Sequence, residues 1–208
     1  MTIDQQSEKI TRRLRREEAP KFAHLKQQMR FGRWKSTYGL VKMALTHFKP
    51  GSVGLEIGSF AGESALIFME TVDALTLFCV DPWESVAEGK SYHAKLVQAR
   101  ECFESVVLKR YERVAAIRQT ADVALSSDRE NFFDWAYIDG GHSEEEVFRD
   151  IKLVLPLVKP GGIIAGHDYG RPNLHPGVTL AVDKAFGKPH HVYEDSSWVA
   201  RNAKVEHE

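Results

Sequence analysis

The sequence predicts an α/β protein in which helices cover a mostly parallel sheet. Short apolar segments alternate with longer segments of helical periodicity along most of the chain. The segment at 75–81 is apolar nearly throughout, which is typical of a strand covered on both faces. With 208 residues, 43% of them hydrophobic, the chain can bury one sizeable core, and its composition excludes intrinsic disorder, a collagen-like fold and a disulfide scaffold.

The expected elements follow one another in a regular alternation. In chain order, we expect strands at 52–58, 75–81, 113–118, 132–139 and 161–168. We expect helices before Pro50, over 62–71, around 96–106, over 143–158 and around 178–186, then a hairpin over 190–203. The helix at 143–158 begins with a capping box of Ser143 and Glu146. Because strands alternate with helices, their crossovers should be right-handed and their carboxyl ends should meet at one edge.

Charge is distributed unevenly, although the whole chain carries a net charge of only −1. Residues 1–35 contain ten Lys and Arg against four Asp and Glu, with weak helical spacing from Ile10 to Met29. We therefore divide the chain into a basic helical or disordered arm, 1–35, and a domain, 36–208. The arm can be a solvated face or leader, a lid, or a homodimer contact. Without interleaved aromatic residues it does not indicate nucleic-acid binding.

Other features of the composition bear on location. Cys79 and Cys102 lie inside apolar patterns, which favours buried thiols in a reducing compartment over a metal or redox site. No apolar run approaches the length of about 18 residues that a membrane helix needs, and the first 20 residues lack a secretory signal. We expect a cytoplasmic protein that does not bind a membrane.

Glycine and aspartate end the first two strands. The first strand leads into a turn from Gly58 to Gly62, which lets a ligand approach the main chain and precedes a helix amino terminus. The turn matches neither the dinucleotide nor the Walker pattern, so a purely structural turn is the alternative. Asp81 ends the second strand and can accept hydrogen bonds from a ribose, or cap a turn.

Further candidates follow the second and third strands. Trp83 can pack against a purine or in the core. After the third strand, the polar segment from Gln119 through Thr120 to Asp122 can read an adenine edge or begin a helix.

Acid and histidine pairs end the fourth and fifth strands. Asp139 is followed by Gly140-Gly141-His142, and His167 precedes Asp168. If these strands are neighbours, Asp139 and Asp168 face each other across a gap suited to a hard divalent cation. His142 has an imidazole whose ordinary pKa suits a general base. Packing alone would select apolar residues at these positions, so we interpret them as a reaction centre.

In combination these segments resemble a known family. The order of GLEIGSFAG, VDPW, YIDGGH and GHDY is similar to class I S-adenosylmethionine-dependent methyltransferases. IDGGHS, KPGG, GHDY and PGVTLAVDKAF resemble the branch of macrocin- and mycinamicin-type sugar O-methyltransferases, over roughly residues 36–202. The resemblance implies a Rossmann-like three-layer sandwich around a seven-stranded, mostly parallel sheet with an antiparallel last strand.

The resemblance also implies where S-adenosylmethionine binds. The turn would hold its methionine part, with Glu56 orienting the amine and Asp81 holding the ribose. The adenine would lie near Gln119 to Asp122. The residues assigned to the cofactor are Glu56, Gly58, Ser59, Phe60, Gly62, Asp81, Pro82, Trp83, Gln119, Thr120 and Asp139.

In metal-dependent relatives, acids at the ends of strands four and five bind magnesium, which holds the acceptor hydroxyl. Asp139 and Asp168 match those positions, and His142 matches a proposed base. His167 stands where relatives carry an acid, and an imidazole is a poorer magnesium ligand. The metal set is therefore Asp139, His167 and Asp168, with magnesium, a softer metal or no metal as alternatives.

The implied reaction is methyl transfer to a small acceptor, assigned to His142 and Asp139. Sugar hydroxyls, phenols, other alcohols and nitrogen acceptors stay open, as does the oligomeric state. A nicotinamide oxidoreductase and a non-catalytic module that binds a nucleoside or partner protein are the competing functions. The failed dinucleotide pattern argues against the oxidoreductase.

Overall fold

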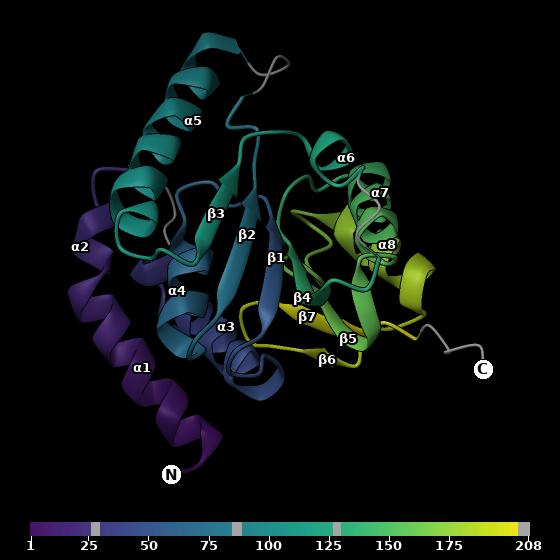
Figure 1. Cartoon of the computed structure of the whole chain (residues 1–208), viewed down its shortest axis with the longest axis horizontal. Helices are drawn as coiled ribbons and strands as arrows, with labels where there is room; N and C mark the ends of the chain where they lie inside the picture. Colours follow the sequence, from purple (N-terminus) through teal and green to yellow (C-terminus); the bar gives the residue numbers. More distant parts are fainter. Residues whose placement is uncertain (26–29, 85–88, 127–129, 204–208) are drawn as a thin grey trace.

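A seven-stranded sheet forms the centre of the protein (Figure 1). The computed structural model describes residues 1–25, 30–84, 89–126 and 130–203. The strand order is β3-β2-β1-β4-β5-β7-β6. The strands are β1 (Val53–Ile57), β2 (Thr76–Val80), β3 (Val114–Ile117), β4 (Phe133–Ile138), β5 (Val158–Gly166), β6 (His191–Val192) and β7 (Trp198–Arg201).

The sheet is parallel from β3 to β5, and β7 runs antiparallel to both β5 and β6. The predicted α/β class, the antiparallel last strand and the hairpin near the carboxyl terminus are therefore confirmed. The prediction that the fourth and fifth strands are neighbours is also confirmed, because β4 pairs directly with β5.

Helices cover both faces of the sheet (Figure 1). On one face lie α1 (Ile3–Glu17), α3 (Trp34–His47), α4 (Glu63–Thr71) and α5 (Gly89–Phe103). On the other face lie α6 (Ala121–Ala124), α7 (Glu144–Val154) and α8 (Pro176–Phe186). The short elements α2 (Ala19–Phe22), η1 (Arg30–Gly32) and η2 (Glu104–Leu108) complete the first layer.

The alternation of side chains along each strand produces two hydrophobic cores. In β4, Trp135 and Tyr137 point into the core under α3 and α4, whereas Ala136 and Ile138 point into the core under α7 and α8. This explains why the strand sequences are apolar nearly throughout: both faces of the sheet are buried.

The described part of the basic arm is helical and packs on the domain. α1 starts with a capping box at Thr2, and its Leu14 is fully buried in the same core as α3. Phe22, Leu25 and Phe31 also belong to that core. The described part of the arm is therefore helical and contributes to the core, a role not among those expected for it, and the lid and homodimer contact stay predictions. Met29 lies outside the described residues.

The boundary between the helix at 143–158 and the next strand was wrong. α7 ends at Val154, and β5 already begins at Val158. Pro156 is the physical reason, because proline lacks the N–H that a continuing helix needs. The capping box itself is confirmed: Ser143 Oγ accepts from the Glu146 N–H, and the Glu146 carboxylate accepts from the Ser143 N–H.

Within the described ranges, every helix is too short or too polar to cross a bilayer.

Candidate active site

The register of the sheet aligns the carboxyl ends of β1, β4 and β5. Beyond the strands, pairing continues for one more residue: Asp139 N donates to Ile57 O at 2.8 Å, and His167 N donates to Ile138 O at 3.1 Å. Gly58 N donates to Val80 O at 2.9 Å on the other side. The glycine turn, Asp139 and His167 therefore lie side by side, as the strand order predicts.

Two glycines of the turn are required by backbone geometry. Gly58 has φ +85°, and a Cβ there would lie 2.3 Å from the carbonyl oxygen of Asp139. Gly62 has φ +86° and precedes α4, with Phe103 and Val107 at 2.7 Å from a built Cβ. Phe60 between them also has a positive φ of 46°. The turn therefore brings the main chain close to β4 without an intervening side chain.

Asp81 fixes the shape of this turn. Its Oδ2 accepts from Phe60 N at 2.8 Å and its Oδ1 from Trp83 N at 2.7 Å. Burial raises the pKa of Asp81, although these main-chain hydrogen bonds oppose the rise. The turn-capping alternative is thus observed, and Asp81 also lines a cavity.

A cavity of 570 Å³ extends from the glycine turn across β1 and β2 to the start of α6. Six of the residues assigned to the cofactor line it: Gly58, Phe60, Asp81, Pro82, Thr120 and Asp139. Ser59 lines a neighbouring cavity instead. Gln119 is exposed and is not part of the lining, while Thr120 lines the cavity and directly precedes α6. The helix-start alternative is thus observed, and contact with an adenine stays a prediction.

Trp83 packs in the core. It is 2% exposed, stands 5.2 Å from the Phe103 ring, and its Nε1 donates to Phe60 O at 2.7 Å. It does not line the cavity beside Asp81. Of its two predicted roles, the structure shows core packing, which supports the glycine turn from below.

Glu56 lies directly beneath the turn and is fully buried. Its Oε2 accepts from Ser59 Oγ at 2.6 Å and lies 3.5 Å from Cys79 Sγ. Burial raises the pKa of Glu56 to about 7, against the opposing hydrogen bond from Ser59. A carboxyl with this pKa is poised to ionise when a cationic group arrives next to it.

We expect Glu56→Gln to remove a pH-dependent cost to stability. The unfolded chain releases this proton near pH 4.5, whereas the folded chain holds it up to about pH 7. As pH rises across this window, the free energy of unfolding of the wild type therefore falls by about 3 kcal/mol relative to that of E56Q. Above the window the difference between the two proteins stays constant.

Urea unfolding of both proteins from pH 4 to pH 8.5 measures this difference. Glu145→Gln, on the exposed side of α7, is the matched control for losing one carboxylate. A stability difference between E56Q and wild type that stays constant with pH would contradict the assignment.

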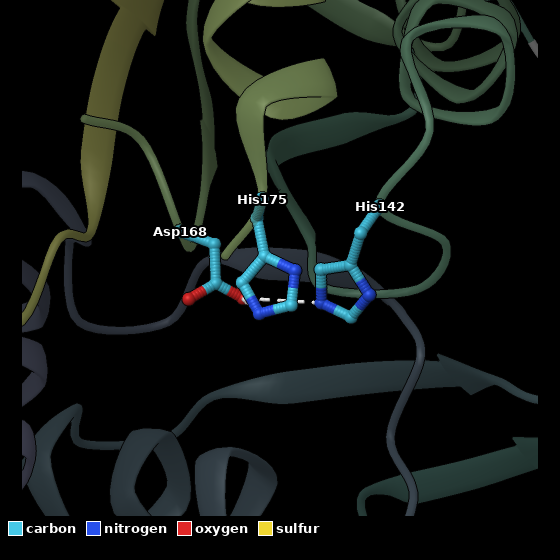
Figure 2. Close-up of side chains that lie close together, drawn as sticks. All are labelled: His142, Asp168 and His175. Carbon is cyan, nitrogen blue, oxygen red and sulfur yellow. Dashed lines mark hydrogen bonds and ion pairs between the residues drawn. The ribbon is translucent and has the colours of Figure 1, made fainter. Parts of the chain in front are cut away.

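His142 and Asp168, one residue from each predicted acid and histidine pair, meet with His175 in one cluster (Figure 2). His142 Nε2 lies 3.0 Å from Asp168 Oδ2, and the His175 ring stacks on His142 with centroids 4.0 Å apart. Burial alone would raise the pKa of Asp168, but hydrogen bonds from His142 and His167 lower it well below its usual range. The hydrogen bond that His142 donates to Asp168 raises the pKa of His142. Burial and His142 lower the pKa of His175.

The ring of His167 lies near both Asp139 and Asp168, and closer to Asp168. His167 Nδ1 lies 3.0 Å from Asp168 Oδ1 and 3.8 Å from Asp139 Oδ1. Asp168 adopts a positive φ of 64°, which turns its side chain toward both histidines. These three residues thus converge as the predicted metal set requires, with one ligand atom from each within 4.8 Å of the others.

A second cavity of 310 Å³ opens over this cluster and shares Gly58, Phe60, Asp139 and His142 with the first. Three of its lining residues carry contacts that sequence reasoning missed. Arg30 forms an ion pair with Asp139, Arg171 Nη1 lies 3.0 Å from Asp168 Oδ1, and His175 stacks on His142.

The sequence held unequal signals for these residues. Arg171 follows Asp168 by three positions and His175 by seven, so both could have been found near a strand end. Arg30 has no such signal, because 109 residues separate it from Asp139.

Comparison with known proteins identifies the family. A family described as "Methyltransferase domain" matches residues 55–169, which is more than half of the chain. The chain belongs to this methyltransferase family.

Two similar proteins illustrate how far this methyltransferase has diverged. It is 29% identical over 146 residues to the uncharacterised protein R132 of Acanthamoeba polyphaga mimivirus, covering 70% of this chain and 64% of that protein. The match thus spans less than two thirds of that relative. A crystal structure from Corynebacterium glutamicum superimposes with a TM-score of 0.56 at 19% identity, over 96% of this chain and 92% of that chain.

An O-methyltransferase from Bacillus cereus, solved in complex with SAH, has a TM-score of 0.51 at 18% identity. The match covers 77% of this methyltransferase and 76% of that chain. At these identities the likeness establishes the shared fold, and the reaction centre has to be argued from the residues of this chain.

Proposed function

We propose that this methyltransferase transfers a methyl group from S-adenosylmethionine to a hydroxyl oxygen of a small molecule, such as a sugar, a natural product or a phenol. The observation that carries the proposal is the junction of the two cavities at Gly58, Phe60, Asp139 and His142. A donor in one cavity and an acceptor in the other would meet at this junction. The macrocin- and mycinamicin-type branch is the proposed relation, on the residues IDGGHS and GHDY.

The larger cavity suits the donor. It is lined by the glycine turn, Asp81 and the start of α6, the segments proposed to hold the methionine, ribose and adenine parts of the donor. Glu56, beneath the turn, is the proposed partner of the amine, because an ammonium nearby would favour the ionised carboxylate. Holding both reactants in line supplies much of the rate enhancement, about 7 to 11 kcal/mol in well-oriented reactions.

His142 is the proposed general base. Because Asp168 is ionised, it orients His142 by accepting from Nε2–H, which leaves the Nδ1 lone pair free for the acceptor proton. The hydroxyl oxygen then attacks the methyl carbon as the carbon–sulfur bond breaks. The proton moves to Nδ1, and neutral S-adenosylhomocysteine leaves. Asp139, beside His142 at the junction, would position the reacting groups.

Asp139, His167 and Asp168 are the residues that would hold a divalent cation. Their convergence fits such an ion, and two oxygens with one nitrogen suit Mn²⁺ better than Mg²⁺. Bound there, a cation would act as a Lewis acid that makes the acceptor hydroxyl more acidic.

Calorimetry and a turnover assay test the proposal. We expect S-adenosylhomocysteine to bind to the full chain and NAD to show no binding. Incubation with S-adenosylmethionine and a panel of sugars, phenols and amines should then release S-adenosylhomocysteine with hydroxyl acceptors. Turnover with amines alone would contradict the hydroxyl acceptor. A non-catalytic module would be favoured if S-adenosylhomocysteine binds but no acceptor is methylated. It would also be favoured if S-adenosylmethionine shows no slow turnover in the absence of an acceptor.

A further inference from the structure

Arg30 brings a positive charge from the N-terminal arm to the carboxyl end of β4. Its Nη2 forms an ion pair with Asp139 Oδ2, and the two side chains are only 14% and 16% exposed. Exposed ion pairs contribute little because solvent screens them, whereas this pair is largely removed from water. The Arg30 guanidinium therefore pairs with the same carboxylate, Asp139, that would bind the proposed metal ion.

The backbone around Arg30 is held in place from two directions. Arg30 N and Phe31 N donate to the Glu63 carboxylate at 2.9 and 3.0 Å, and Thr37 Oγ1 donates to Arg30 O at 2.9 Å. Phe31 is 1% exposed in the core, and Glu63 opens α4 directly after the glycine turn. These contacts fix where the Arg30 side chain starts, so its pairing with Asp139 is built into the fold.

Two arginines already offset the two carboxylates of the proposed metal set. Arg30 pairs with Asp139, and Arg171 pairs with Asp168. A divalent cation entering between these carboxylates would meet two nearby guanidinium groups, and repulsion between like charges weakens its binding. Arg30 Nη1 is buried and has no hydrogen-bond partner among the described residues, so the pair does not satisfy the guanidinium fully.

We propose that Arg30 is the resident counter-ion of Asp139 and that a divalent cation binds to this carboxylate only by displacing it. The inference rests on the metal set of the proposed function and adds a competitor from the N-terminal arm. Arg30 thereby sets the metal affinity of the enzyme, and the arm and the metal site are coupled through one carboxylate.

Titration of the cofactor-free full chain with Mn²⁺, followed by the loss of the free-ion paramagnetic resonance signal, tests this directly. We expect Arg30→Gln to raise the Mn²⁺ affinity at least tenfold over the wild type. Arg30→Met, which keeps an unbranched side chain but removes the charge and the hydrogen-bond donors, should do the same. The double variant R30Q/D139N should lose this gain, because the ligand for which the two cations compete is gone.

Arg13→Gln is the matched control. Arg13 is another arginine of the arm and pairs with Glu70 at 2.6 Å, away from both cavities. It should leave the Mn²⁺ affinity unchanged. Thermal unfolding and S-adenosylhomocysteine binding of each variant verify that the fold is intact.

Equal or weaker Mn²⁺ binding by R30Q would overturn the inference, as would a gain that survives in R30Q/D139N or absence of binding in every variant. Methyl transfer is measured separately as S-adenosylhomocysteine release. If the wild type methylates an acceptor but R30Q shows no gain in Mn²⁺ affinity, this inference is wrong and the proposed function holds. If R30Q binds Mn²⁺ more tightly but no acceptor is methylated, this inference holds and the proposed function fails.

Discussion

Replacement of His142 by alanine is expected to lower the rate of methyl transfer by about 10²- to 10⁴-fold, the usual contribution of a positioned general base. The reason is the orientation of the ring by Asp168, whose Oδ2 lies 3.0 Å from Nε2, and its place at the junction of the two cavities (Figure 2). Initial rates at saturating S-adenosylmethionine measure the effect.

The pH dependence of the same reaction provides a second readout. A base acts in its neutral form, so the rate should fall as pH decreases through the pKa of His142. Asp168 raises that pKa above the ordinary 6.5, and the fall should therefore begin at a higher pH than for a free imidazole. Asp168→Asn, which removes the charge, should move the midpoint to lower pH.

His191→Ala is the control for His142→Ala. His191 is an exposed residue of β6 and lines neither cavity described here. It should leave the rate unchanged, and both variants should bind S-adenosylhomocysteine as the wild type does. An unaltered rate in H142A with cofactor binding intact would show that another group accepts the proton.

Replacement of Trp135 by alanine is expected to lower the free energy of unfolding by about 3 to 5 kcal/mol, as for other large buried side chains. The indole stacks on Phe48 with ring centroids 3.8 Å apart, contacts Phe68 edge-on, and donates from Nε1 to Ser52 Oγ at 3.1 Å. The indole packs over Gly54 of the neighbouring strand β1, where a Cβ would lie 2.1 Å from the ring.

Urea unfolding monitored by far-UV circular dichroism measures this loss. Leu174→Ala is the comparison, because Leu174 is 69% exposed and its removal should change the free energy of unfolding by less than about 0.5 kcal/mol. A Trp135→Ala protein as stable as the wild type would mean that the core under α3 and α4 repacks readily.

Most of the fold could be predicted from the sequence because its signals are local. Apolar runs marked the strands, helical spacing marked α3, α7 and α8, and the capping box at Ser143 fixed where α7 begins. The end of α7 was misplaced because the apolar residues continue past Pro156, so periodicity and backbone chemistry disagreed there. The proline decides, since it removes a helical hydrogen bond.

The proximity of Asp139, His142 and Asp168 could also be predicted, for a topological reason. Parallel strands with right-handed crossovers bring their carboxyl ends to one edge, so residues that follow β4 and β5 must be neighbours. This topology predicts which residues are neighbours but does not predict their side-chain rotamers. It did not show that the His167 ring would lie near both carboxylates.

The sequence by itself therefore determined the order of elements, the α/β class and the edge at which acids and histidines gather, because periodicity and strand-end position are properties of short segments. Only the tertiary structure decided that Trp83 packs in the core and that Arg30 reaches Asp139. Both depend on how distant segments pack. Trp83 packs against the Phe103 ring, and the main-chain N–H of Arg30 donates to the Glu63 carboxylate. Contacts between such distant residues leave no periodic trace in the sequence, and the folded chain alone fixes them.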